Sequence, residues 1–461
     1  MNHSKIVLML FAFGCAPGFG FASSFNIIYT FPSQTTGLYP AGTPYIGSGG
    51  VLIATTAAGG TPCTTFPLGC GTVFSLSPPS TPGGSWIQAT LFSFSGVDGA
   101  QPETGVIPGL NGSLAGTTSN GGPANTHCRA GCGTFFQLTP PTEPGGIWTE
   151  EVLYDFLKAD FEPNALLAGP NGVFFGAALF GGNMGCSLGC GSLYELTPPS
   201  EGGTTWTLSP IHQFAFSTGD YPNTPLIAGA NGVLYGTAEG GGNMNLKECD
   251  GGCGTVFSLT PPVAPATAWT FQDIYRFRSG SDGYIPQSGL VLGADGTLYG
   301  TTYYGGGSGC AGGGFVKPVA DPGPGCGTVF SLTPPTAGGL WTEAVLYSFQ
   351  GGTADGSFPE SQSSNLVIRP GGVLYGVTTG GGGSGCFGQG CGVLYELAPP
   401  STPGGSWTET ILHIFTGGAD GENPYSGPAI DSTGVLYGFA NGGTGTACSG
   451  GGCGVVYQYI P

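Results

Sequence analysis

The sequence is poor in charged residues and especially poor in bases. Only 7% of its 461 residues are charged, with 8 Lys and Arg against 26 Asp and Glu. Helical proteins with ion-paired faces and charge-rich disordered chains both need far more charge, so neither class fits. The formal net charge of -18 also disfavours nucleic acid and anionic membranes as partners, because the chain would be repelled by phosphate.

Histidine is scarce as well. Beyond His3, the chain has only His127, His212 and His413, which occur in three different repeats. This scatter disfavours a catalytic triad or another acid–base site built on histidine. We therefore assign no catalytic residue, no metal ligand and no cofactor from the sequence.

Long apolar runs are missing too. A short one, Ile6 to Phe13, follows Lys5 and precedes small residues. This pattern is typical of a secretory signal peptide, which we place at residues 1–24, and the run is too short to span a bilayer. Lipid attachment through Cys15 is the alternative. We expect no transmembrane segment after signal removal and a secreted protein, extracellular or periplasmic, with residues 25–461 as one domain.

Cysteine, by contrast, is regular. Apart from Cys15, the cysteines form neighbouring pairs, one pair in each stretch of about sixty residues. In an exported chain this distribution predicts local disulfides. A zinc site needs four converging ligands, and only His127 lies beside a pair, so metal binding is the weaker reading. The predicted bonds are Cys63–Cys70, Cys128–Cys132, Cys186–Cys190, Cys249–Cys253, Cys310–Cys326, Cys386–Cys391 and Cys448–Cys453.

Each cysteine pair belongs to a repeat, and the sequence holds seven of them. The second cysteine opens a strand such as Cys-Gly-Thr-Val-Phe-Ser-Leu, which ends at Pro-Pro in the first six units. An alternating strand that begins at a tryptophan comes next, as in residues 341–349. The tryptophans lie 58 to 72 residues apart, at Trp86, Trp148, Trp206, Trp269, Trp341 and Trp407.

The rest of each repeat predicts a loop and a hairpin. The loop usually contains Asp and then Pro, and the hairpin turns at Asn-Gly or Asp-Gly. Such dipeptides supply the positive φ angles that a tight primed turn requires. We expect this turn at Asn111-Gly112, Asn171-Gly172, Asn231-Gly232 and Asp295-Gly296.

Four short strands per repeat and seven repeats predict an all-β fold, a seven-bladed β-propeller with four antiparallel strands per blade. A β-solenoid is the alternative, although its rungs are shorter. We further predict that residues 25–31 supply the missing outer strand of the last blade and pair with residues 454–460. The ring is then closed by both chain ends and has no open edge.

The aspartates of the Asp-Pro loops allow two readings. They could form an acidic ring that holds Ca²⁺ or a cationic ligand. We favour the other reading, in which each Asp caps its own turn, because one side chain per blade is too widely spaced to converge on one ion. The residues are Asp98, Asp160, Asp220, Asp282, Asp355 and Asp420.

Binding sites on repeat folds tend to lie where one copy departs from the others. The fifth repeat departs most, because residues 303–326 add aromatic and charged side chains to its cysteine loop. A surface of this kind suits a sugar or a peptide, and a tolerated insertion is the alternative. The candidate ligand-binding residues are Tyr303, Tyr304, Phe315, Lys317 and Asp321.

The repeat resembles the GloVer tandem repeat (choice-of-anchor type) family of exported bacterial β-propellers. The resemblance lies in Asp-Gly-x-x-Pro, Gly-x-Leu-Tyr-Gly-Thr-Thr and Gly-Thr-Val-Phe-Ser-Leu, with clear copies at residues 282–332 and 355–397. It implies an extracellular propeller of unassigned activity, often with a C-terminal anchor. We find no such anchor in this sequence.

We therefore expect a non-enzymatic, monomeric, secreted propeller that binds an extracellular glycan or protein on the face of the cysteine loops. The alternative is a polysaccharide lyase or hydrolase that uses acids such as Asp321 or Glu239 near the central channel. A structural component of the cell envelope is a third possibility.

Overall fold

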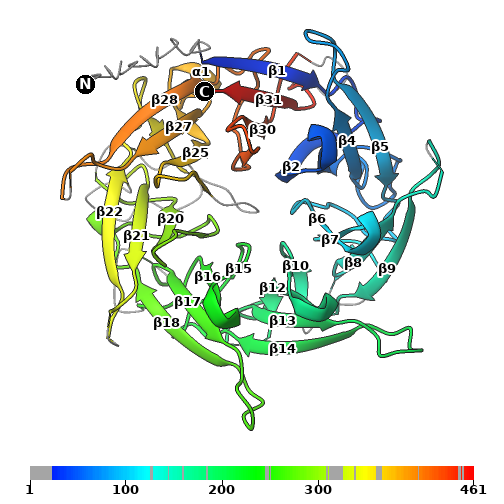
Figure 1. Cartoon of the computed structure of the whole chain (residues 1–461), viewed down its shortest axis with the longest axis horizontal. Coiled ribbons are helices and arrows are strands. Elements are labelled where there is room, and N and C mark those ends of the chain that lie inside the picture. The colour runs from blue at the N-terminus through cyan, green and yellow to red at the C-terminus, as the bar shows by residue number, and fades with distance from the viewer. Residues whose placement is uncertain are drawn as a thin grey trace, which may run out of the picture.

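The structure is a computed structural model of the whole chain, and it describes residues 23–124, 128–143, 145–157, 160–182, 185–243, 249, 251–307, 310, 325–336, 339–359, 366–402, 404–444, 448 and 451–461. In this part of the chain, antiparallel sheets surround a central axis like the blades of a propeller (Figure 1). No helix among the described residues is long and apolar enough to cross a membrane.

The ring has seven blades, as the repeats predict, and each blade runs outward from an inner strand to an outer one. Blades one to three consist of β2 (Leu38–Ile46), β3 (Leu52–Ala58), β4 (Thr72–Ser77) and β5 (Ile87–Ser93); β6 (Val106–Pro108), β7 (Leu114–Thr118), β8 (Thr134–Thr139) and β9 (Thr149–Asp155); and β10 (Asp160–Pro163) with β11 (Leu167–Ala168), β12 (Phe174–Gly181), β13 (Ser192–Thr197) and β14 (Thr207–Gln213).

Blades four to six repeat this order. They consist of β15 (Ile227–Ala228), β16 (Leu234–Ala238), β17 (Thr255–Thr260) and β18 (Thr270–Arg276); β19 (Val291–Leu292), β20 (Leu298–Thr302), β21 (Thr328–Thr333) and β22 (Thr342–Ser348); and β24 (Val367–Ile368), β25 (Leu374–Thr378), β27 (Val393–Ala398) and β28 (Thr408–Ile414), beside which β23 (Gly356–Ser357) pairs with β26 (Gly380–Gly381).

Blade seven joins the two ends of the described chain. Its strands β29 (Ala429–Ile430), β30 (Leu436–Ala440) and β31 (Val455–Ile460) are completed by β1 (Ser24–Thr30). β1 and β31 are antiparallel, with Ser24 opposite Ile460 and Thr30 opposite Val455, and Figure 1 shows them side by side. The prediction that an N-terminal strand closes the ring is confirmed.

Aromatic side chains hold neighbouring blades together. After each outer strand comes a phenylalanine that is at most 2% exposed, and its ring contacts a Phe or Tyr of the next blade at a centroid distance of 5.0 to 5.6 Å. The tryptophans face the other way: Trp269 packs on Phe175 and Trp407 on Tyr299, each in the preceding blade. The hydrophobic core therefore lies between blades, which is why single repeats cannot bury it alone.

The hairpin turns follow the prediction with one correction. At Asn111, Asn171 and Asn231 both the Asn and the following Gly have positive φ. Asp295 does not, although Gly296 does; instead its carboxylate accepts hydrogen bonds from the backbone N–H and Oγ1 of Thr297. The expected pair of positive φ angles is wrong there, because the side chain of Asp295 caps the turn to which it belongs. The turns carry the short 3₁₀ segments η1 (Ser48–Gly50), η2 (Leu110–Gly112), η3 (Pro170–Gly172) and η4 (Ala230–Gly232), while η5 (Gly280–Asp282) lies in a loop.

Candidate functional site

The inner edge of every blade begins with a strained residue followed by proline. These residues have φ between 45° and 59°, and none is glycine. Each donates its backbone N–H to the carbonyl of the second disulfide cysteine in the preceding blade, over 2.8 to 3.2 Å. The pairs are Tyr39–Cys453, Gln101–Cys70, Glu162–Cys132, Tyr221–Cys190, Ile285–Cys253, Phe358–Cys326 and Asn423–Cys391.

A second contact explains why glycine follows that cysteine in every repeat. A Cβ on this glycine would lie 2.3 to 2.8 Å from Cδ of the proline in the next blade, too close for any other residue. Cys-Gly and the proline thus form one joint between blades, and the joint fixes the backbone at the inner edge. In three neighbouring blades, side chains next to this proline line one cavity.

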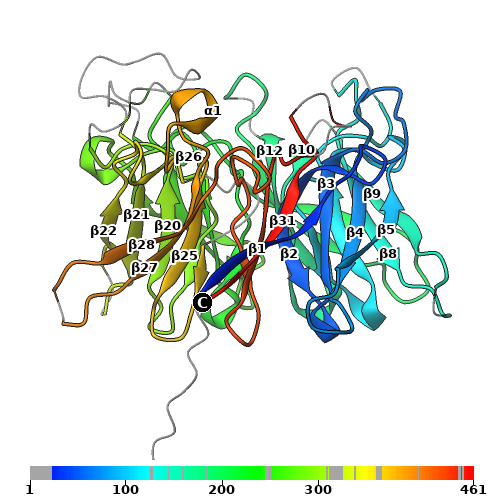
Figure 2. The same cartoon turned by 90° about the horizontal axis from the view of Figure 1, so that it is seen from above.

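At blades two, three and four these side chains line a cavity of about 520 Å³ on the face that carries the disulfide loops. Figure 2 shows that face with α1 (Gly385–Gly388), which lies in the disulfide loop of blade six. We call this cavity the central pocket. Its lining is Glu103, Thr104, Ser119, Glu162, Pro163, Asn164, Leu179, Phe180, Tyr221, Asn223 and Glu239.

Three glutamates from three successive blades give the central pocket its charge. Burial raises the pKa of Glu103, Glu162 and Glu239, and the neighbouring Glu103 raises that of Glu162 further. Glu103 accepts a hydrogen bond from Oγ of Ser119 at 3.2 Å, whereas the carboxyl of Glu162 has no hydrogen-bond partner among the described residues. The pocket therefore holds carboxyls that are poorly solvated and close enough to repel one another.

Side-chain amides connect three blades along one wall. Asn164 donates to Asn223 at 3.3 Å, Asn223 donates to Oε1 of Glu239 at 2.8 Å, and Gln287 donates to Oε2 at 3.4 Å. Asn223 and Gln287, the two donors to Glu239, counter the effect of burial on its pKa. We call Asn164, Asn223, Glu239 and Gln287 the amide belt. It holds each member in one orientation and leaves further lone pairs and N–H groups for a ligand.

Two aromatic side chains also line the central pocket. The ring of Phe180 stacks on Phe161 at 5.2 Å and meets Tyr221 edge-on at 5.7 Å. Phe180 and Tyr221 both line the central pocket and are only partly buried. A ligand in the pocket would thus meet both aromatic rings and hydrogen-bonding groups.

A family model described as the Gloeobacter/Verrucomicrobia repeat matches residues 39–315, more than half of the 461 residues. The chain belongs to this family. The resemblance seen in the repeat motif is thereby confirmed. A search of curated proteins finds no match.

Some solved structures are similar to this Gloeobacter/Verrucomicrobia repeat protein. A fungal alcohol oxidase of the AA5 family in complex with copper is similar at a TM-score of 0.53 and 16% identity, over 95% of this chain and 76% of that one. At this identity the likeness to the oxidase shows the propeller fold alone. An ulvan lyase of polysaccharide lyase family 25 gives 0.49 and 9%, over 94% and 96%. A PQQ-bound aldose sugar dehydrogenase from Streptomyces coelicolor gives 0.40 and 11%, over 95% and 99%.

The sequence-predicted binding residues of blade five are only partly described. Tyr303 is half-buried on the inner edge of the ring and stacks with Phe358 at 5.2 Å, while Tyr304 is 4% exposed and stacks with Tyr284 at 5.3 Å. Tyr304 therefore belongs to the core between blades rather than to a surface. Phe315, Lys317 and Asp321 lie outside the described residues.

The sequence did single out one residue of the central pocket, Glu239, as an acid for the alternative enzymatic function. Glu103 and Glu162 were missed. Their signal was available, because both flank the proline that recurs at the start of each blade. That these two positions line a cavity is visible only in the folded ring.

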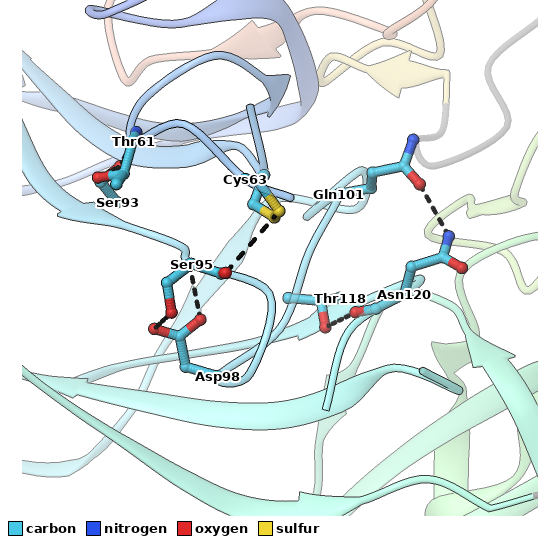
Figure 3. The surroundings of a disulfide bond; sticks show 9 residues. Thr61, Cys63, Ser93, Ser95, Asp98, Gln101, Thr118 and Asn120 are labelled. Atoms are coloured by element: carbon cyan, nitrogen blue, oxygen red, sulfur yellow. Dashed lines mark hydrogen bonds between the residues drawn. A yellow bond between two sulfur atoms is a disulfide. The ribbon is translucent and has the colours of Figure 1, made fainter. Parts of the chain in front are cut away.

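The structure joins the same seven cysteine pairs that the sequence predicts, with Cα–Cα distances of 5.0 to 5.6 Å. Figure 3 shows the Cys63 disulfide beside the loop in which the carboxylate of Asp98 accepts the N–H of Ser95 at 2.8 Å. In the same view, Asn120 donates to Gln101 at 2.8 Å. The disulfides thus support the loops around the pocket and are not part of its lining.

Most of the loop aspartates cap turns, as expected. The carboxylates of Asp98, Asp282, Asp355 and Asp420 accept backbone N–H groups of their own loops. In the loops of Asp160 and Asp220, where the Asp and Pro are closer together, the prediction that the Asp caps its own turn is wrong. Asp160 instead accepts Oγ of Ser192, and Asp220 is 1% exposed, with Oδ1 unpaired among the described residues. A shorter loop leaves no backbone N–H within reach of these side chains.

The histidines of the outer strands are packing residues. His212 stacks on Phe271 at 3.7 Å and His413 on Phe25 at 3.5 Å, each ring belonging to the next blade. Burial lowers the pKa of both imidazoles, to about 4 for His212. Both imidazoles therefore pack between neighbouring blades. His127 lies outside the described residues.

A second cavity, of about 490 Å³, lies between the inner turns of blades five and six. Its walls are mainly glycine, alanine, proline and aliphatic residues around Asp295 and Arg369. The guanidinium of Arg369 already donates to the hydroxyl of Tyr375 at 3.0 Å. This cavity has fewer converging polar groups than the central pocket, which we take as the candidate site.

Proposed function

We propose that the protein is an extracellular binding module that holds a carbohydrate in the central pocket. The supporting observation is the lining itself, in which carboxyl, amide and hydroxyl groups and two aromatic rings border one cavity. A sugar ring presents hydroxyls at its edge and C–H groups on its face, so it matches both kinds of group. Seven disulfides support an oxidising compartment and hence export.

A folded protein partner is less well matched. Stable protein interfaces bury on the order of 800 Å² on each side. The central pocket is concave and has the volume of a site for a small ligand. A carbohydrate chain can place one or two residues in it while the remainder stays outside.

The central pocket also supports a second function, hydrolysis or lytic cleavage of a polysaccharide. Burial raises the pKa of all three glutamates, and a carboxyl that stays protonated beside an ionised one is what acid–base cleavage of a glycosidic bond requires. Copper chemistry like that of the AA5 oxidase finds no support, because the described lining has neither His nor Cys, the side chains copper favours.

The binding function is tested by calorimetric titration of the intact protein with a panel of oligosaccharides. We expect at least one to bind, and we expect Phe180→Ala to weaken it about tenfold through the loss of ring stacking. Phe387→Ala is the matched control, since Phe387 lies in α1 and is fully exposed outside the pocket. Equal loss in both variants, or no binding to any sugar, would refute the proposal. Product release that stops in Glu239→Gln would establish the enzymatic function instead.

A further inference from the structure

We propose that the carbohydrate held in the central pocket carries a free amino group, as in a glucosamine polymer. This inference rests on the proposed function and adds the chemistry that selects the ligand. The pocket has three carboxyls, and none of its described lining residues is Lys, Arg or His. A sugar with carboxylate or sulfate groups would be repelled, whereas an ammonium group would be attracted.

The position of the amine follows from which oxygens are already used. Glu239 accepts hydrogen bonds at both oxygens from the amide belt, so its geometry is set by protein donors. Glu162 accepts none from the described residues, and Glu103 accepts only the hydroxyl of Ser119. Glu103 and Glu162 both line the central pocket, from neighbouring blades. An ammonium group between them would satisfy free oxygens of both carboxyls and remove their mutual repulsion.

The rest of the pocket accounts for the sugar. Beside Glu162 in sequence, Pro163 and Asn164 lead into the amide belt, which offers both donors and acceptors to ring hydroxyls. Phe180 and Tyr221 supply a surface for the C–H face of a pyranose. A lysine side chain has the charge but no sugar ring to stack on Phe180 and no hydroxyls to pair with the amide groups, so both would lack a partner.

The probes are a glucosamine tetramer, its fully N-acetylated form and cellotetraose, titrated calorimetrically into the intact protein at pH 7. The three share a β-1,4-linked backbone and differ at the second carbon of each ring. We expect the glucosamine tetramer to bind at least about tenfold more tightly than either of the others, because acetylation or replacement by hydroxyl removes the charge-assisted hydrogen bonds.

The variant that isolates the amine contact is Glu162→Gln, which keeps the shape of the side chain and removes its charge. It is expected to bring the affinity for the glucosamine tetramer down at least about tenfold, to the level of cellotetraose. Glu201→Gln is the control, because Glu201 belongs to the same blade and is exposed outside the pocket. Thermal unfolding checks that both variants are folded, and Glu103→Gln serves as a second test should Glu162→Gln be unstable.

The outcomes separate the two proposals. If cellotetraose binds as tightly as the glucosamine tetramer, the amine inference is wrong and the carbohydrate-binding function stands. If a lysine-rich peptide displaces the tetramer at equal concentration, charge alone selects the ligand and the amine inference is again wrong. If no sugar of the larger panel binds, both proposals fail.

Discussion

At the residue scale, we expect buried carboxyls between blades to make the stability of the protein depend on pH. Glu150, Glu343 and Glu409 occupy the same position in the outer strands β9, β22 and β28, and each has a buried Oε1 without a hydrogen-bond partner among the described residues. Burial raises the pKa of each to about 7, and the charge of a loop aspartate adds to this: Asp98, Asp282 and Asp355, respectively. Folding near neutral pH is therefore coupled to the binding of protons by these three outer-strand glutamates.

The direction of the pH effect follows from these shifts. A carboxyl whose pKa is higher in the folded state gives its full stabilisation below its unfolded pKa of about 4.5, and this stabilisation is lost as the pH rises through about 7. We expect the melting temperature to be higher at pH 5 than at pH 8. A scan by differential calorimetry checks this, and a melting temperature that rises between pH 5 and pH 8 would contradict it.

Glu343→Gln isolates one of these carboxyls. The amide keeps a hydrogen-bond donor for Asp282 without the charge, so the variant should be more stable than the natural protein at pH 8 by about 1 kcal/mol, after solvent screening of a half-buried group is allowed for. At pH 4 the two should be equal within error. Glu201→Gln, at an exposed position, should change stability at neither pH. Urea titrations at both pH values measure the difference.

At the scale of the element, the joint between blades is what turns a strand repeat into a ring. The Cys-Gly strand of one blade and the Pro of the next are in contact seven times around the ring, and the same joint positions the pocket residues. The sequence shows the Cys, the Gly and the Pro in every repeat, but it does not show that they touch. Only the fold shows that the repeated Cys-Gly and Pro residues position the side chains of the central pocket.

Gly454→Ala tests that joint. The new Cβ would lie 2.3 Å from Cδ of Pro40 in the next blade and 3.5 Å from the carbonyl oxygen of Ala440 in its own blade, at a φ of 110°. We expect a loss of about 3 kcal/mol, of which about 1 kcal/mol is backbone strain. Gly145→Ala is the control, since Gly145 has a φ of 80° and open space around it, and it should lose only the strain energy. Equal losses in urea unfolding would show that blades do not meet at this contact.

At the scale of the whole molecule, the two ends of the described chain meet in blade seven. β1 covers one edge of β31, and Phe25 of β1 contacts His413, Phe415 and Tyr457 in blades six and seven. Without β1, the outer edge of β31 would be exposed along its whole length.

We expect a chain that begins at Phe31 to be less stable than one that begins at Ser24 by at least about 3 kcal/mol, from the apolar side chains of β1 that would no longer be buried. It should also associate in solution through the exposed edge. A synthetic peptide of residues 24–30 should restore the monomer and the melting temperature. Unchanged unfolding and sedimentation in the shorter chain would contradict the closure.

The sequence predicted the fold but indicated only one residue of the central pocket, for one physical reason. Strands, turns and disulfides depend on residues close together in the repeat, so Trp341, Asn231-Gly232 and Cys386 with Cys391 could be interpreted locally. The central pocket depends on residues about sixty positions apart, such as Glu103, Glu162 and Tyr221, which only the closed ring brings together. The insertion in blade five can be recognised in the sequence because it breaks the repeat. The residues of the central pocket occupy positions that every repeat has, and only their side chains are unusual.

Hydrogen exchange measured by mass spectrometry, with and without a bound oligosaccharide, tests most directly where the ligand lies. A ligand in the central pocket should slow exchange in the peptides that contain residues 101–104, 162–164, 221–223 and 239, and should leave the inner turns of blades five and six unchanged. Protection confined to residues 303–326 or to the opposite face, with these four segments unaffected, would contradict this prediction.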